Sequence, residues 1–188
     1  MRNIEIKLCR PDGLTDIRFA ELLTKMGATH VWDRHQSDTF WHTQRGWLKL
    51  REVTETAVGD PVAAELIGYQ RSTGTTDARP SDYHISTIAD PESLKAALDS
   101  TLGRIETVEK TRALWLWKQT RVHLDEVNHL GAFVELETVL DDIDEQQGHG
   151  QLQECLRELQ LEGAQRLATP YLEMLLQNRR SQAAGSNA

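Results

Sequence analysis

The 188-residue sequence has few of the features that mark membrane, disulfide-rich or nucleic-acid-binding proteins. Its two cysteines, Cys9 and Cys155, are too few and too far apart for a disulfide framework, so we expect a reducing, cytoplasmic location. No apolar run approaches the roughly 20 residues that span a bilayer. The polar residues 1–5 also lack the apolar segment of a signal peptide. We therefore expect no membrane partner.

Positive charge is also in the minority. The chain has 21 Lys and Arg against 29 Asp and Glu, which gives a formal net charge of −8. Non-specific nucleic-acid binding depends on neutralising many phosphates, so we expect no nucleic-acid partner. The net charge does not exclude a small phosphate ligand in a local basic pocket, because many Lys and Arg residues are concentrated in short alternating segments.

Those segments alternate polar and apolar residues with a period of two, which is typical of β-strands. Strands are predicted at 3–8, 29–40, 47–54, 63–71, 82–88, 104–116, 119–127 and 132–139. Helices are predicted at 14–26, 93–102, 144–160 and 170–179, and Asp90 as N-cap with Pro91 in the first turn opens the second of them. No repeat or linker divides the chain, so we expect a single domain over residues 1–180 and a disordered tail at 181–188.

The polar faces of these strands carry charges rather than Ser, Thr or Gln. Glu5 and Lys7, for example, alternate with Ile4 and Ile6. A polar face that meets water is the usual interpretation of one such strand. If the aliphatic faces instead pack against the helices, the charges line an interior, which is costly unless they are paired or hold a ligand. We therefore expect a mainly β (α+β) fold, in which about eight short antiparallel strands form a barrel or a sandwich; in a barrel the charged faces would line the interior.

The charged faces contain two chemical sets. The acidic set offers oxygen ligands that suit hard divalent cations: Glu5, Asp125, Glu135 and Glu137. The basic set suits a polyanion: Lys7, Lys49, Arg51, Arg71, Lys110, Arg112 and Arg121. A metal ion with several cations is what a triphosphate needs, because its reactions are helped mainly by positioning and charge neutralisation.

Taken in order, these segments resemble the CYTH superfamily, or triphosphate tunnel metalloenzymes, which includes class IV adenylyl cyclases, thiamine triphosphatases and inorganic triphosphatases. The family's E-x-E-x-K strand reads Asn3-Ile4-Glu5-Ile6-Lys7 here. Further matching segments are 37–40, 48–52, 109–112, 122–127, 130–137 and 171–175. The resemblance covers residues 2–176, and its His-Leu-Asp-Glu-Val and Asp-Thr-Phe segments look most like the class IV adenylyl cyclase branch.

The resemblance implies a closed eight-stranded antiparallel β-barrel or tunnel with a charged interior and helices packed outside. It also implies roles for these residues. Glu5, Glu135 and Glu137 would ligate Mg²⁺ or Mn²⁺, and the seven basic residues would bind the triphosphate. Glu5, Lys7, Asp125 and Glu137 would form the catalytic set. Asn3 stands where the family has a first Glu; its amide oxygen can still ligate a cation but adds no charge, which weakens the case for a second metal ion.

The implied activity is the conversion of ATP to cyclic AMP and pyrophosphate. Three alternatives stay open: an inorganic or thiamine triphosphatase, a non-catalytic nucleotide- or polyphosphate-binding protein, and a salt-bridged barrel without a ligand. His123 can be structural or a phosphate contact, and Tyr171 can plug one tunnel mouth or only pack there. Relatives are often homodimers, although the sequence indicates no dimer surface.

Overall fold

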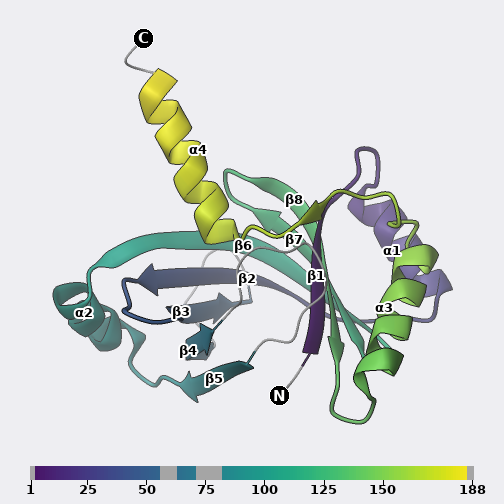
Figure 1. Ribbon diagram of the computed structural model, residues 1–188, viewed down its shortest axis with the longest axis horizontal. Coiled ribbons are helices and arrows are strands. Elements are labelled where there is room, and N and C mark those ends of the chain that lie inside the picture. The colour runs from purple at the N-terminus through teal and green to yellow at the C-terminus, as the bar shows by residue number, and fades with distance from the viewer. Residues whose placement is uncertain (1–2, 56–62, 71–81, 186–188) are drawn as a thin grey trace.

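The computed structural model describes residues 3–55, 63–70 and 82–185, which form an antiparallel sheet and four helices (Figure 1). The strands are β1 (Asn3–Cys9), β2 (Thr29–Trp41), β3 (Trp47–Thr54), β4 (Ala63–Gln70), β5 (Asp82–Thr87), β6 (Arg104–Trp117), β7 (Thr120–Val127), β8 (Gly131–Val139) and β9 (Arg166–Leu167). The helices are α1 (Asp16–Lys25), α2 (Pro91–Thr101), α3 (Glu145–Glu158) and α4 (Tyr171–Gly185). The expected mainly β, α+β class is confirmed.

The strands form one sheet in the order β5-β4-β3-β2-β6-β7-β8-β1-β9. The prediction of a closed eight-stranded barrel is wrong in two respects. The sheet has a ninth strand, because Arg166 and Leu167 pair with β1. It is also open: within the described ranges β5 pairs with β4 alone, and β9 with β1 alone. Alternation identifies a strand but carries no information about whether two sheet edges meet.

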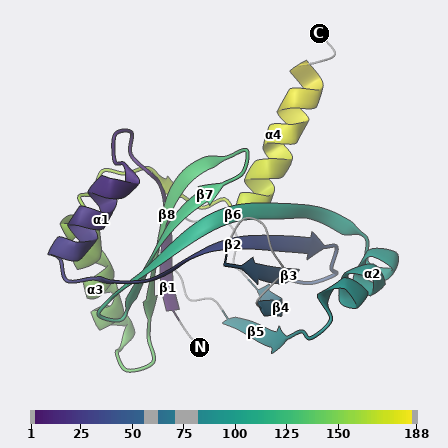
Figure 2. The ribbon, with the colours of Figure 1, turned by 180° about the vertical axis from the view of Figure 1, so that it is seen from behind.

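The aliphatic faces of β1, β7 and β8 are buried under helices, as the alternation predicted. Ile4 and Leu8 of β1 are fully buried in one cluster with Phe19 of α1 and Leu152 of α3. Each such side chain stabilises the fold by about 1.5–3 kcal/mol. Helices α1 and α3 both lie at this end of the sheet, and both contribute side chains to the same buried cluster (Figures 1 and 2). The opposite face of the same strands is therefore the one that carries the charges.

Helix α2 covers another part of the sheet. It begins at the predicted position, where the Asp90 side chain accepts a hydrogen bond from the backbone N–H of Ser93. The indole Nε1 of Trp41 donates to Asp99 Oδ1 at 2.7 Å, which ties β2 to this helix. No helix in the described ranges is long and apolar enough to cross a membrane.

Helix α4 packs its first turns against the sheet and then projects from it (Figure 1). Tyr171, Leu172 and Leu175 join a buried cluster with Phe40 and Phe133. The helix continues to Gly185, so the tail expected at 181–188 is helical as far as that residue, and residues 186–188 lie outside the described ranges.

Candidate active site

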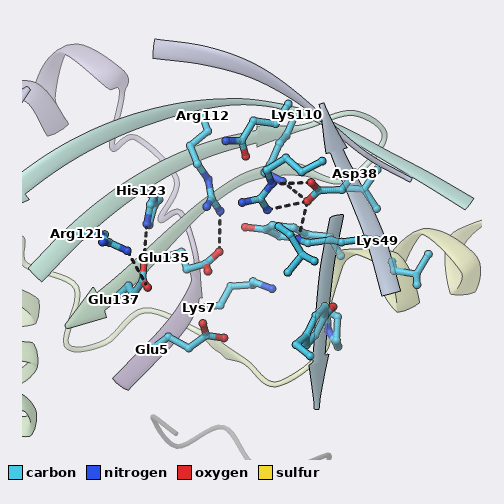
Figure 3. A pocket seen from close by; sticks show the side chains of 18 of the residues that line it. Glu5, Lys7, Asp38, Lys49, Lys110, Arg112, Arg121, His123, Glu135 and Glu137 are labelled. Atoms are coloured by element: carbon cyan, nitrogen blue, oxygen red, sulfur yellow. Dashed lines mark hydrogen bonds and ion pairs between the residues drawn. The ribbon is translucent and has the colours of Figure 1, made fainter. Parts of the chain in front are cut away.

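The charged strand faces line one pocket of about 440 Å³, whose wall includes side chains from β1 to β8 and from the start of α4 (Figure 3). Six basic side chains line it: Lys7, Lys49, Arg51, Lys110, Arg112 and Arg121. Four acidic side chains line it: Glu5, Asp38, Glu135 and Glu137. The lining thus carries two more basic than acidic groups. The excess is one when Asp125, which lies behind Arg112, is counted as well. The whole chain, in contrast, has a net charge of −8.

The structure brings nearly all of the predicted site residues together. The six basic residues and the three predicted metal-binding glutamates line the pocket, and so does Asn3. Asp125 lies directly behind the wall, where it contacts Arg112. Arg71, the seventh predicted phosphate-binding residue, lies outside the described residues.

One buried carboxylate, Asp38, gathers three of the cations. Arg51 donates from Nε at 2.7 Å and from Nη2 at 2.9 Å, and Lys49 and Lys110 each donate at 3.0 Å. Burial opposes ionisation of Asp38, but Arg51 and the two lysines hold its pKa well below the usual range. Sequence reasoning assigned Asp38 no role. The available signal was its position on the same strand face as Gln36 and Phe40.

The clustered cations disfavour one another's charge. Burial, with the neighbouring Arg51 charge, lowers the pKa of Lys49 from 10.5 to about 7. Burial also lowers the pKa of Lys7 and of Lys110. Asp38 neutralises only part of the positive charge of this cluster. A bound polyanion would therefore interact favourably with several positive groups at once.

A second cluster centres on Arg112. Its guanidinium makes a bidentate contact with Asp125, at 2.5 Å for each bond, and also donates to Glu135 at 2.9 Å. Tyr171 donates its hydroxyl to Asp125 at 2.9 Å, and its ring lies 3.9 Å from the Lys7 ammonium. Tyr171 therefore both packs at the base of α4 and lines the pocket.

The third cluster lies where β1 pairs with β8. Glu5 and Glu137 are cross-strand partners, so their carboxylates share the pocket face. Glu137 accepts hydrogen bonds from Arg121 at 3.2 Å and from Asn3, and lies 3.3 Å from His123 Nε2. Burial opposes ionisation, but the His123 hydrogen bond and the Arg121 charge lower the pKa of Glu137 to about 2.

His123 is held in this cluster as a hydrogen-bonding residue. Burial lowers its pKa, which favours the neutral imidazole. Its Nδ1 atom is buried and has no hydrogen-bond partner among the described residues. The contact with Glu137 favours the structural interpretation of His123 over the phosphate contact.

The donor atoms of the third cluster suit a hard divalent cation. Glu5 and Glu137 offer carboxylate oxygens, and Asn3 Oδ1 is a buried oxygen without a hydrogen-bond partner in the described part of the chain. Across the described residues, no three or more His, Cys, Asp or Glu side chains are already grouped as metal ligands. Glu135 and Glu137 are instead turned to Arg112 and Arg121. Those contacts would have to rearrange when a cation binds.

Comparison with known proteins gives one family and several similar folds. The family model for the CYTH domain matches residues 1–171. No curated protein matches the chain. The PH1012 protein of Pyrococcus horikoshii OT3 has a similar structure, with a TM-score of 0.75 and 16% identity over 91% of this chain and 98% of that one.

Two further solved structures share the fold. The PH1819 protein of Pyrococcus horikoshii OT3 has a TM-score of 0.71 and 21% identity over 94% of this chain and 99% of that one. A candidate adenylate cyclase from Vibrio parahaemolyticus has a TM-score of 0.70 and 19% identity over 92% and 97%. At these identities the likeness concerns the fold alone.

Proposed function

This chain belongs to the CYTH family, and on that basis we propose that its pocket is the active site of a metal-dependent enzyme that converts ATP to cyclic AMP and pyrophosphate. One observation carries the proposal: a cation-rich lining and a carboxylate pair lie in the same pocket. A polyanion and a divalent cation are the ligands that such a combination suits.

The basic residues would bind and orient the phosphates. Lys49, Arg51 and Lys110 converge on one point, now occupied by the Asp38 carboxylate, and a phosphate group presents the same kind of oxygen acceptors. Lys7 and Arg121 would neutralise charge nearer to Glu5 and Glu137. Charge stabilisation of a departing pyrophosphate is the main chemical help that these residues can give.

The carboxylates would hold the metal ion. Glu5, Glu135 and Glu137 would supply its charged ligands and Asn3 a neutral oxygen. A bound Mg²⁺ or Mn²⁺ supplies charge neutralisation at the phosphate and lowers the pKa of an oxygen nucleophile. Asp125 is already engaged by Arg112 and Tyr171, so we assign it a positioning role through Arg112 instead of direct catalysis.

A product assay tests this proposal. ATP, inorganic triphosphate and thiamine triphosphate are each incubated with Mg²⁺ and with Mn²⁺, and the products are separated. Cyclic AMP and pyrophosphate from ATP are expected. Orthophosphate from any substrate would instead identify a triphosphatase, and tight binding without turnover of all three would identify a non-catalytic binding protein.

The first mutational prediction concerns Glu137. Glu137→Gln removes a metal-binding charge but keeps the side chain's shape, so turnover should fall by at least about a hundredfold. The circular dichroism spectrum should not change. The matched control is Glu126→Gln on β7, where the side chain is 63% exposed. Unfolding of Glu137→Gln, or full activity in it, would contradict the assigned role.

A further inference from the structure

Tyr171, the first residue of α4, reaches into the pocket that the strands line. It is 8% exposed, and the two ends of its side chain meet different groups of the pocket wall. The hydroxyl donates to Asp125 Oδ2 at 2.9 Å, and the centre of the ring lies 3.9 Å from the Lys7 ammonium. A single side chain of α4 therefore contacts residues of two strands, β7 and β1, which are separated in the sheet by β8.

Asp125 links Tyr171 to Arg112. The side chain of Asp125 is fully buried, and that of Arg112 is 8% exposed. Arg112 donates to Asp125 from Nε and from Nη2, at 2.5 Å each, so the carboxylate fixes the plane of the guanidinium. The Tyr171 hydroxyl donates to the same Oδ2 atom that accepts from Nη2, which restricts the rotation of the carboxylate. Loss of the hydroxyl would therefore free both Asp125 and Arg112 to turn.

Glu135 is the second carboxylate that holds Arg112. Arg112 Nη2 donates to Glu135 Oε2 at 2.9 Å, and Glu135 is the cross-strand partner of Lys7 (Figure 3). In the proposed function Glu135 is a metal ligand, so its carboxylate would turn from Arg112 to the cation. Among the described residues, Asp125 would then be the one carboxylate still hydrogen-bonded to Arg112. The hydrogen bond from Tyr171 to Asp125 would therefore be needed most when the metal ion is bound.

We propose that Tyr171 is a positioning residue, which acts through Asp125 to keep the Arg112 guanidinium in place for the bound phosphates. This inference rests on the proposed function and adds a residue of α4 to its site. The role needs only the hydroxyl, since a phenylalanine ring would still pack at the base of α4 and lie against Lys7. Removal of the hydroxyl alone therefore separates positioning from packing.

Nuclear magnetic resonance of the protein without ligand tests the contact itself. Among the described residues, the Arg112 Nε–H donates to Asp125 alone, and its signal is assigned by its loss in Arg112→Lys. Exchange of this hydrogen with water should be about tenfold faster in Tyr171→Phe than in wild type. The matched control is Tyr69→Phe, which removes the same atom from another tyrosine of the pocket lining and should leave the rate unchanged. An unchanged rate in Tyr171→Phe would overturn the inference and leave the proposed function intact.

Binding calorimetry then tests what the contact does for the ligand. The ligand is α,β-methylene ATP with Mg²⁺, because the methylene bridge prevents loss of pyrophosphate. The proteins are wild type, Tyr171→Phe, Arg112→Lys, the two changes combined, and Tyr69→Phe. Circular dichroism checks that every variant is folded.

Tyr171→Phe should weaken binding of the nucleotide about tenfold, and Tyr69→Phe by less than about twofold. In the Arg112→Lys background, Tyr171→Phe should cost less than about a further twofold, because lysine cannot make the bidentate contact that the hydroxyl supports. Unchanged binding in Tyr171→Phe, or an equal tenfold loss in both backgrounds, would overturn the inference. Failure of wild type to bind the nucleotide would overturn the proposed function itself.

Discussion

Asp38 shows how a single residue prepares the pocket. Three basic side chains with pocket-facing charges would repel one another in a buried site, and this carboxylate holds them together in the absence of a ligand. It is 4% exposed, and Lys110 beside it is 2% exposed, so little water screens the interaction. Asp38 therefore stabilises the fold and, in the proposed function, would also set the geometry of the cations for phosphate binding.

Asp38→Asn should destabilise the protein by about 3 kcal/mol, because it leaves buried cations without their counter-charge. A bound triphosphate would replace the missing charge. Inorganic triphosphate with Mg²⁺ should therefore raise the melting temperature of the variant more than that of wild type, as measured by differential scanning calorimetry. Asp33→Asn, at a side chain that is 66% exposed, is the control. Equal shifts in Asp38→Asn and wild type would show that triphosphate does not contact this cluster.

For single residues, the sequence predicts which side chains face the pocket better than it predicts which partners those side chains contact. Alternation within β1 and β8 was enough to place Glu5, Lys7 and Glu137 on one face, because side-chain direction has a period of two. The contact of Glu137 with Asn3, and that of Asp125 with Tyr171, join residues more than forty positions apart. Pairing between distant segments leaves no local pattern to read.

Among the elements, α3 depends most visibly on close packing. A Cβ atom at Gly148 would lie 2.5 Å from Leu140 Cδ2 and 3.1 Å from Ile4 Cδ1. Glycine at this position lets the helix approach β1, whose other face carries Glu5 and Lys7. The outer packing of α3 thus supports the inner, charged face of the strand.

Gly148→Ala should lower the free energy of unfolding by about 1–3 kcal/mol relative to Gly150→Ala, because overpacking against Leu140 and Ile4 opposes the helix preference of alanine. Gly150→Ala is a matched control in the same helix, because its Cβ would meet no atom within 4 Å. This second change should stabilise the protein by up to about 1 kcal/mol, since alanine favours helix over glycine. Urea unfolding curves measure both. Equal effects of the two substitutions would argue against the close contact of α3 with β1.

The sequence predicts well those strands and helices that are long enough to show a periodic pattern of apolar residues. All eight predicted strands are present, and each of their ends lies within one residue of its predicted position. The two-residue β9 is too short for any alternation, and it forms only because residues 166–167 meet the edge of β1. Helix α4 passes its predicted end at 179, since residues 180–185 include good helix formers.

For the whole molecule, the main feature is a positive pocket in a negatively charged chain. The Lys49 pKa of about 7 lies below its ordinary value of 10.5, so the unfolded chain holds this proton between those pH values and the folded protein does not. Stability from this group is therefore complete above pH 10.5 and is lost as the pH falls through 7. A bound polyanion would raise the Lys49 pKa and reverse the proton loss.

Triphosphate binding at pH 8 should consequently take up protons, about one of them on Lys49. Calorimetry of inorganic triphosphate with Mg²⁺ in buffers of different ionisation enthalpy measures the number. Lys49→Met should reduce the uptake by about one proton, and comparison with wild type cancels the ligand's own titration. An identical uptake in both proteins would place the ligand away from Lys49.

In the proposed function, one pocket holds a triphosphate on its cations and a divalent ion on its carboxylates. A crystal structure with Mn²⁺ and α,β-methylene ATP tests it most directly, because manganese is located by its anomalous scattering. We expect an anomalous peak beside Glu5 and Glu137, with phosphates in contact with Lys49, Arg51 and Lys110. Manganese or nucleotide bound elsewhere on the protein, with this pocket's ion pairs unchanged, would contradict it.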